Sequence, residues 1–211
     1  MSTVYWPGLH KELERLVLNC EVCLKYLQAK HRQKRSEQLG QEIPATPWTK
    51  LASDLFHFDG ASHLLIVDYT SRFPVIHKLR GQDGKSVISV FKQLCSEHGW
   101  PDALITDNGP CYTSQEFVSL MQAKGVNHIT SSPHYPQSNG LAEKYVQLTK
   151  SLFKKAAEEG KDPLDALLIY RSTPLTRDLQ SPIKTLENRI PRSDLPMSKS
   201  AQARYKRSEI I

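Results

Sequence analysis

Three short apolar runs in the first half of the chain decide which fold classes are open to it. They cover residues 49–58, 63–68 and 73–79, and the turn signals Asp59–Gly60 and Thr70–Arg72 separate them. Short apolar runs between turn residues are typical of β-strands, and connections this short join antiparallel neighbours. The sequence therefore predicts an antiparallel meander of three strands.

Helical and strand patterns alternate after the meander. The predicted order is a helix over 84–98, a strand over 103–106, a helix over 114–124, a strand over 126–130, a long helix over 141–157 and a helix over 163–171. The apolar stripe of the long helix is expected to run through Leu141, Tyr145, Leu148 and Leu152, with Phe153 on its flank. This order predicts an α/β fold with helices packed on a mixed sheet of five strands.

The front of the chain combines a short amphipathic helix with a pair of cysteines. Apolar side chains recur at helical spacing over residues 9–17, so we expect a helix that ends near Cys20. Cys20 and Cys23 have the spacing at which two thiolates bind one Zn²⁺, but a complete site needs two further ligands. Because His10 and His31 form no recognisable second pair, an incomplete zinc site and a plain thiol pair both remain open.

Charge and composition narrow the class of partner. The 28 Lys and Arg against 22 Asp and Glu leave a net charge of +6, which favours a polyanion such as nucleic acid. Residues 29–47 are polar and basic, which indicates a linker that is either solvated or in contact with phosphate. No run has the roughly 18 apolar residues of a membrane span, and the first residues lack the pattern of a signal peptide. We therefore expect an intracellular protein that is neither secreted nor inserted in a membrane.

Three carboxylates occur where this layout would bring them together. Asp54 lies within the first predicted strand, Asp107 directly follows the strand at 103–106, and Glu143 begins the long helix, with 35 residues between the last two acids. Hard divalent cations take oxygen ligands, and the phosphate of a substrate can supply the remaining ones. The set predicts a divalent-metal site for phosphoryl transfer.

Each acid also has an ordinary structural interpretation. Asp107 could simply begin a type I turn over Asp107–Pro110, and Glu143 could be a first-turn acid that the helix dipole favours. Asp68 also ends an apolar strand, but its neighbours Thr70–Arg72 favour a turn-capping or ion-paired role for it. The combination of acids, rather than any single one, indicates the metal site.

The same residues resemble a known family: the integrases of gypsy-class long-terminal-repeat retrotransposons, within the retroviral integrase superfamily. The resemblance covers about residues 4–192. It rests on the segments Tyr5–Gly8, Cys20–Cys23, Trp48–Phe56, Val67–Phe73, Thr106–Gly109, Ser132–Glu143 and Tyr170–Pro174. It implies a ribonuclease-H-like core, a five-stranded mixed sheet flanked by helices, with a small helical remnant at the N-terminal end.

The resemblance implies a role for the three acids. Asp54, Asp107 and Glu143 would bind two Mg²⁺ or Mn²⁺ ions and make the protein a DNA polynucleotidyl transferase. Such an enzyme trims the 3′ ends of element DNA with water and then joins those ends to target DNA, without a covalent protein intermediate. The implied partners are element ends and target DNA, and the active form would be a homo-oligomer. The implied location is the nucleus, or the cytoplasm before nuclear entry.

Further residues would contact DNA. In the family, polar and basic residues on the helix after the glutamate contact the DNA end, and the loop before it lies beside the metals. The implied DNA-binding residues are Lys150 first, together with Gln147, Lys154, Gln137, Asn139 and Gly140. Solvated surface lysines and ordinary turn residues are the alternative interpretations.

The resemblance also divides the chain. The implied parts are a remnant of a zinc-binding helical domain over 1–28, the basic linker over 29–47, the catalytic core over 48–175 and a partly disordered C-terminal extension over 176–211. The family places a His pair before the Tyr5–Gly8 stretch, and this sequence begins just before that stretch. We therefore expect the zinc site of Cys20 and Cys23 to be incomplete, so that Zn²⁺ binding is in doubt. We also expect the chain to be a shortened or domesticated descendant of an integrase. A non-catalytic host protein that kept nucleic-acid or protein binding is the alternative to an integrase, and ribonuclease H proper lacks the loop before Glu143.

Overall fold

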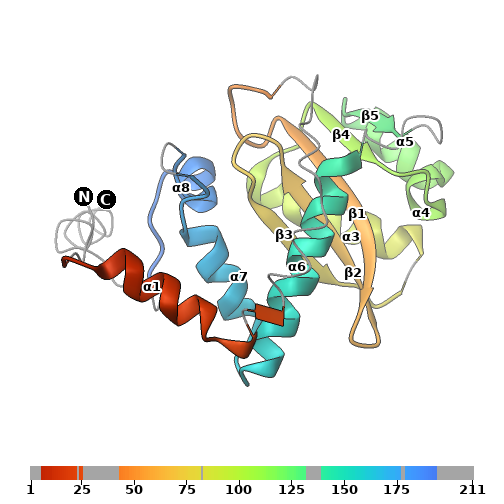
Figure 1. Ribbon diagram of the computed structural model, residues 1–211. Coiled ribbons are helices and arrows are strands. Elements are labelled where there is room, and N and C mark those ends of the chain that lie inside the picture. Colours follow the sequence, from red (N-terminus) through yellow and green to blue (C-terminus); the bar gives the residue numbers. More distant parts are fainter. Residues whose placement is uncertain are drawn as a thin grey trace.

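A five-stranded mixed sheet forms the centre of the computed structural model (Figure 1). The structure describes residues 6–22, 24–25, 43–81, 83–131, 139–176 and 179–193. The strands are β1 (Lys50–Phe58), β2 (Ala61–Asp68), β3 (Pro74–Lys78), β4 (Ala103–Thr106) and β5 (Asn127–Thr130), and they lie in the order β3-β2-β1-β4-β5.

The pairing of the strands confirms the predicted meander. β1 pairs with β2 and β2 with β3, both antiparallel, whereas β4 pairs parallel with β1 on one side and with β5 on the other. The parallel half follows from the sequence, because a helical segment precedes each of its added strands and parallel neighbours need such crossovers. The predicted fold class, a mixed sheet flanked by helices, is confirmed.

Helices cover both faces of the sheet. In Figure 1 α6 (Gly140–Glu158) crosses in front of the sheet, while α3 (Gly84–His98) lies behind it. The short α4 (Pro110–Thr113) and α5 (Gln115–Ala123) share the buried cluster of α3 and so pack on the same face. Strand side chains alternate between faces, so each face has its own buried cluster. Behind the sheet the cluster includes Leu51, Leu64, Ile66, Leu104, Phe91 and Phe117. In front it includes Ala52, Phe56, Val67, Ile105, Leu141 and Tyr145.

Two further helices extend the core. α7 (Pro163–Ser172) is fastened to the edge strand β3 by Arg171, whose Nε and Nη2 donate to the carbonyl oxygen of Pro74 at 3.0 and 2.7 Å. The guanidinium also lies 4.4 Å from the centre of the Phe73 ring. α8 (Pro182–Glu187) places Ile183 in the cluster behind the sheet.

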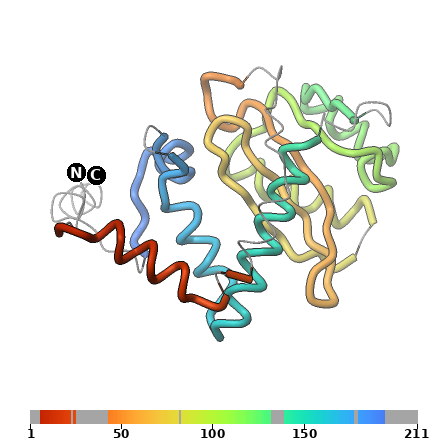
Figure 2. Tube along the Cα trace, viewed as in Figure 1, coloured from red at the N-terminus to blue at the C-terminus, as the bar shows by residue number. Residues whose placement is uncertain are grey.

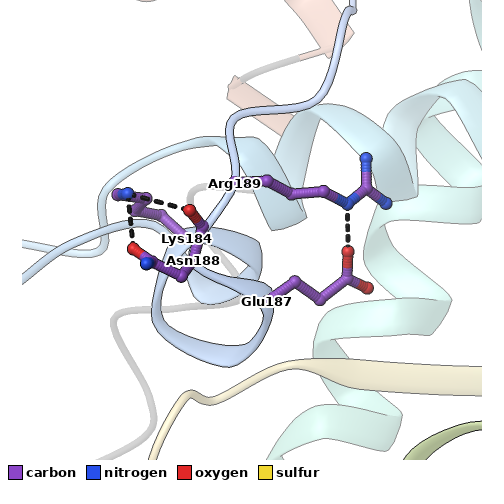
Figure 3. A network of polar contacts seen from close by, with 4 residues as sticks. All are labelled: Lys184, Glu187, Asn188 and Arg189. Carbon is purple, nitrogen blue, oxygen red and sulfur yellow. Dashed lines mark hydrogen bonds and ion pairs between the residues drawn. The ribbon is translucent and has the colours of Figure 1, made fainter. Parts of the chain in front are cut away.

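The end of α8 is closed by a small polar network (Figure 3). Lys184 Nζ donates to the backbone and side-chain oxygens of Asn188 at 3.1 and 2.7 Å, and Arg189 forms an ion pair with Glu187. Asn188 adopts a left-handed conformation with φ of 52°, which stops the helix.

The first helix lies apart from the sheet. α1 (Leu9–Leu18) is separated from the strands in Figures 1 and 2, and none of its residues is buried. The segment that follows α1 reaches α6, because Lys25 Nζ lies 2.5 Å from Glu158 Oε1. No helix within the described part of the chain is long and apolar enough to cross a membrane.

Three elements differ from the expectation. α4 was not predicted, and it forms because Pro110 suits the first position of a helix and Cys111 and Tyr112 are buried. α8 was not predicted either. The prediction for α6 is right at Leu141, Tyr145 and Phe153, which are buried, but Leu148 and Leu152 are only partly buried. The buried face is completed by smaller residues and one valine: Ala142, Val146, Thr149 and Ala156.

Candidate active site

Asp54 and Asp107 lie at the same level along two neighbouring strands of the sheet. β1 and β4 are parallel neighbours, and Ala52 pairs with Ile105. Asp54 follows Ala52 by two residues, and Asp107 follows Ile105 by two. Because the side-chain period of a strand is two, both acids continue the face on which Ala52 and Ile105 pack. This register places Asp54, within β1, beside Asp107, which directly follows the end of β4.

Glu143 reaches the same face of the sheet from α6. The helix packs on β1 through Leu141 and Ala142, which share a buried cluster with Ala52. Asn139, at the N-terminal end of α6, donates its side-chain amide to the carbonyl oxygen of Ser53 at 3.2 Å. These contacts seat the first turn of α6, with the exposed Glu143, against the strand that carries Asp54.

The pKa of Asp54 reports this convergence. Burial raises the pKa, and the negative charges of Asp107 and then Glu143 raise it further, to about 6 from an ordinary value of 3.8. The backbone N–H of Leu55 and the Lys150 ammonium act in the opposite direction. The three carboxylates therefore share one electrostatic environment, with Asp107 exerting the stronger charge effect on Asp54.

The chemistry of the donor set fits a hard divalent cation. Asp54, Asp107 and Glu143 offer oxygen ligands from three elements, and a cation would relieve both the burial and the mutual repulsion that raise the pKa of Asp54. Within the described ranges, no three His, Cys, Asp or Glu side chains already converge tightly enough to hold an ion on their own. The carboxylates fit a site that water and phosphate oxygens would complete.

The turn after β4 holds Asp107 from one side. The backbone N–H of Gly109 donates to Asp107 Oδ1 at 3.1 Å, and Asn108 Nδ2 donates to the carbonyl oxygen of Ser131 at 2.7 Å. Gly109 has a φ of −57°, which any residue adopts, but a Cβ there would lie 3.0 Å from Asp107 Oδ1. Space beside the carboxylate, rather than backbone freedom, is what the glycine provides.

A buried hydroxyl pair supports β1 behind Asp54. Ser53 Oγ donates to the carbonyl oxygen of Leu65 at 2.9 Å and lies 2.8 Å from Tyr112 Oη. Since the single proton of Ser53 is used on Leu65, Tyr112 donates to Ser53. Burial raises the pKa of Tyr112 well above its ordinary value, so the phenol stays a donor. α4 is thereby tied to the strand that carries the first acid.

The structure places the predicted DNA-binding residues unequally. Lys150 Nζ lies 5.8 Å from the centre of the Phe56 ring and its charge lowers the pKa of Asp54, so it lies near the acids, while its contact with DNA stays a prediction. Gln147 and Lys154 are exposed further along α6. Gly140 begins α6.

The residue before α6 is buried. Asn139 is only 2% exposed, and its Oδ1 has no hydrogen-bond partner. In this structure its amide fixes α6 to β1, and contact with DNA stays a prediction. Gln137 lies outside the described residues.

Two other predictions from the sequence concern residues away from the three acids. Asp68 is fully buried and accepts from the backbone N–H of Trp48 at 3.0 Å and from the N–H and hydroxyl of Ser71 at 2.7 and 2.6 Å, so it has the capping role expected for it. The zinc hypothesis involves Cys20 and Cys23, and Cys23 lies outside the described residues. The zinc hypothesis therefore stays a prediction.

Some residues that shape the site were missed by sequence reasoning. They form two pairs. Ser53 contacts Tyr112, which depends on α4, and Thr106 contacts His128, which depends on the register of β4 and β5. No local signal in the sequence marks these pairs. Gly109 belongs to the turn predicted after the strand, and its position two residues after an acid is the signal for an Asx-type turn.

Comparison with known proteins shows to which family the sheet and its three acids belong. Residues 45–136 match the family model described as the integrase core domain. This chain carries an integrase core domain. It is 32% identical over 179 residues to an uncharacterized protein of Caenorhabditis elegans, which covers 82% of this chain and 14% of that protein. It is 28% identical over 150 residues to the Pol-related polyprotein of a mouse intracisternal A-particle, and this aligned region covers 71% of this chain and 17% of the polyprotein.

Solved structures agree with this integrase core in fold. A chain of the simian T-cell lymphotropic virus intasome superposes with a TM-score of 0.62 at 21% identity, over 90% of this chain and 72% of that chain. The catalytic core domain of HTLV-2 integrase in complex with magnesium superposes with a TM-score of 0.52 at 24% identity, over 65% of this chain and 95% of that chain. The first of these matches extends beyond the core over most of the chain.

Proposed function

We propose that this protein is an integrase-type DNA polynucleotidyl transferase of the gypsy class, which processes the 3′ ends of element DNA and joins them to target DNA. The observation that carries the proposal is the convergence of Asp54, Asp107 and Glu143 on one face of the sheet of an integrase core. The parallel strands β1 and β4 and the helix α6 supply the three acids, and the charges of Asp107 and Glu143 raise the pKa of Asp54.

The three carboxylates would hold two Mg²⁺ or Mn²⁺ ions. When bound, such ions stabilise the attacking and leaving oxygens of a phosphodiester during in-line displacement. The magnesium complex of the HTLV-2 core supports this choice of ion. Asp54 must be ionised to act as a ligand, and its pKa of about 6 allows this at neutral pH.

The outer face of α6 would bind the DNA end. Glu143, Gln147, Lys150 and Lys154 follow one another at helical spacing, so a phosphate beside the acids would meet the Lys150 ammonium. The net charge of +6 assists a polyanionic partner. Dimeric and trimeric forms of the HTLV-2 core support a homo-oligomer. An integrase acts on chromosomal DNA, so we also propose a nuclear location.

Strand transfer tests the proposal directly. Labelled duplexes with randomised ends are incubated with supercoiled plasmid and Mn²⁺ or Mg²⁺, and joined products are sequenced. We expect the wild-type chain to join ends to plasmid and Asp107→Asn to lose about 10³-fold or more of this activity, as the loss of a group that stabilises transition-state charge does.

The matched control is Asp102→Asn. Asp102 is an exposed acid before β4, at the opposite end of that strand from Asp107, and its loss should leave the products unchanged. Equal amounts of joined product from wild type and Asp107→Asn would show that Asp107 is not part of the active site. DNA binding without products from any chain would favour the alternative, a non-catalytic host protein on the same core.

A further inference from the structure

A chain of two hydrogen bonds links the edge strand β5 to the backbone of Asp107. Thr106 Oγ1 lies 2.8 Å from the carbonyl oxygen of Asp107 and 2.9 Å from His128 Nε2. The contact follows from the sheet register, because His128 pairs with Leu104, two residues before Thr106 on the same face. Thr106 is fully buried, so water does not compete for its hydroxyl.

Proton accounting fixes the direction of the chain. A threonine hydroxyl has one proton, and a carbonyl oxygen can only accept. The proton of Thr106 is therefore committed to Asp107, and the Thr106 oxygen must accept from His128. His128 consequently carries its ring proton on Nε2, the tautomer that can donate to Thr106.

We propose that His128 is a positioning residue of the active site, which acts through the Thr106 hydroxyl to hold the main chain of Asp107. The proposal rests on the function proposed above, because it assigns Asp107 as a ligand. It adds a residue on β5, a strand that contributes none of the three acids.

The surroundings of His128 suit this role. Its ring packs edge-on against Phe117, with centroids 5.3 Å apart and an interplanar angle of 68°, and Phe117 is fully buried. Burial lowers the pKa of His128, which keeps the ring neutral. A ring held in one orientation presents its Nε2 proton to Thr106 continuously.

The consequence for Asp107 is restraint from two sides. Gly109 N–H holds its carboxylate at Oδ1, while Thr106 holds its carbonyl oxygen. The backbone N–H of Ser131 donates to the carbonyl of Thr106 at 2.8 Å, which anchors the residue before Asp107 to the segment after β5. Loss of the His128 donor would free the Thr106 hydroxyl to turn away and release the Asp107 carbonyl.

The tautomer is the first test, and it needs no metal and no activity. Long-range ¹H–¹⁵N correlation NMR on the metal-free full chain, with His128 assigned by comparison with His128→Gln, reports which ring nitrogen carries the proton. We expect the proton on Nε2. A proton on Nδ1 alone would overturn the proposal, because Nε2 could then only accept.

The second test separates positioning from plain stability. Mn²⁺ binding is measured by calorimetry without DNA, and thermal unfolding is followed in parallel. His128→Leu and Thr106→Val should each weaken Mn²⁺ binding about tenfold, the lower end for outer partners of metal ligands. The double variant should be no weaker than either single one. His128→Gln, which keeps a donor near Nε2, should bind within about threefold of wild type.

The control is His77→Leu, at a partly buried histidine on β3 at the opposite edge of the sheet. It should leave Mn²⁺ affinity unchanged even if it lowers the melting temperature. If His128→Leu melts earlier but binds Mn²⁺ like wild type, His128 is only structural and the proposal fails. If the wild-type chain binds no Mn²⁺, the proposed function itself fails, whatever the tautomer.

Discussion

Asp54 is the side chain whose chemistry the fold changes most visibly at the candidate site. Its pKa is about 6 in the folded protein because of burial and the charges of Asp107 and Glu143, against an ordinary value of 3.8. Between these pH values the folded state binds more protons at this position than the unfolded state does. Raising the pH through this window therefore lowers the stability of the metal-free protein, and the loss is complete above about pH 6.

Asp54→Asn should remove this loss. We expect the variant to melt at a higher temperature than wild type near pH 7 and to show a smaller advantage near pH 4. The measurement is thermal unfolding in a chelating buffer across this range. Glu143→Gln, at an exposed acid of the same site, serves as the control and should change the pH dependence less. If the melting temperatures of wild type and Asp54→Asn changed in parallel with pH, the raised pKa of Asp54 would be contradicted.

Gly109 offers a test of space beside Asp107. A Cβ at Gly109 would lie 3.0 Å from Asp107 Oδ1, while the backbone there tolerates alanine. Gly109→Ala should therefore weaken Mn²⁺ binding by about tenfold or more by displacing the carboxylate. Its stability should change little, because a compatible Gly→Ala change gains only about 0.4–1 kcal/mol.

The chain contains a matched control for this substitution. A Cβ at Gly81 would lie 3.1 Å from Asp83 Oδ1, almost the same crowding of an aspartate outside the site. Gly81→Ala should leave Mn²⁺ binding as it is. Calorimetry on both variants decides the matter, and equal binding by Gly109→Ala and wild type would show that the Asp107 carboxylate is not a ligand in this geometry.

Among the elements, α6 joins the acids to a basic face. Lys150 acts on Asp54 and would also meet a DNA phosphate, so Lys150→Ala should weaken binding of a DNA duplex and reduce the salt slope of binding by about 1. Lys92→Ala, at an exposed position of α3 behind the sheet, is the control. Fluorescence anisotropy over a salt series gives both slopes, and identical slopes for the two variants would refute the contact.

The sequence predicted most elements but not the whole buried face of α6. Periodicity gave the meander, α3 and the parallel strands, because their apolar positions are bulky and well spaced. On α6 it favoured Leu148 and Leu152, whereas the structure buries Thr149 at 1% exposure and leaves both leucines partly exposed. Ala142 shares a buried cluster with Ala52 of β1, and both Ala142 and Thr149 are small enough to be buried where a leucine would need more space, which hydrophobicity alone does not reveal.

The candidate site was predictable to a different degree. The three acids could be named from their positions and spacing, since Asp54 lies within a recognisable strand, Asp107 directly follows one and Glu143 lies in the first turn of the long helix. The hydroxyl contacts behind them could not, because a shift of one residue in the β4–β5 register would point His128 to the other face. Register is a property of the folded sheet, and no short stretch of sequence determines it.

For the molecule as a whole, the folded unit is larger than the region that the integrase family model matches. That match ends at residue 136, yet α6 carries one of the three acids and α7 is bonded to the edge strand through Arg171. α8 adds Ile183 to the cluster behind the sheet, together with Val75 and Leu79. The predicted division between a core over 48–175 and an extension stays untested, but α8 packs as part of the core.

Ile183 therefore gives the sharpest test of where the core ends. Ile183 is 4% exposed, whereas Ile190, just beyond α8, is 40% exposed. Ile183→Ala should cost about 2–4 kcal/mol of unfolding free energy through lost burial and a residual cavity. Ile190→Ala should stay within about 0.5 kcal/mol of wild type, as surface substitutions do. Urea unfolding of both variants measures the difference. If Ile183→Ala were as stable as Ile190→Ala, α8 would be an attachment, and the stability of the active-site scaffold would end with α7.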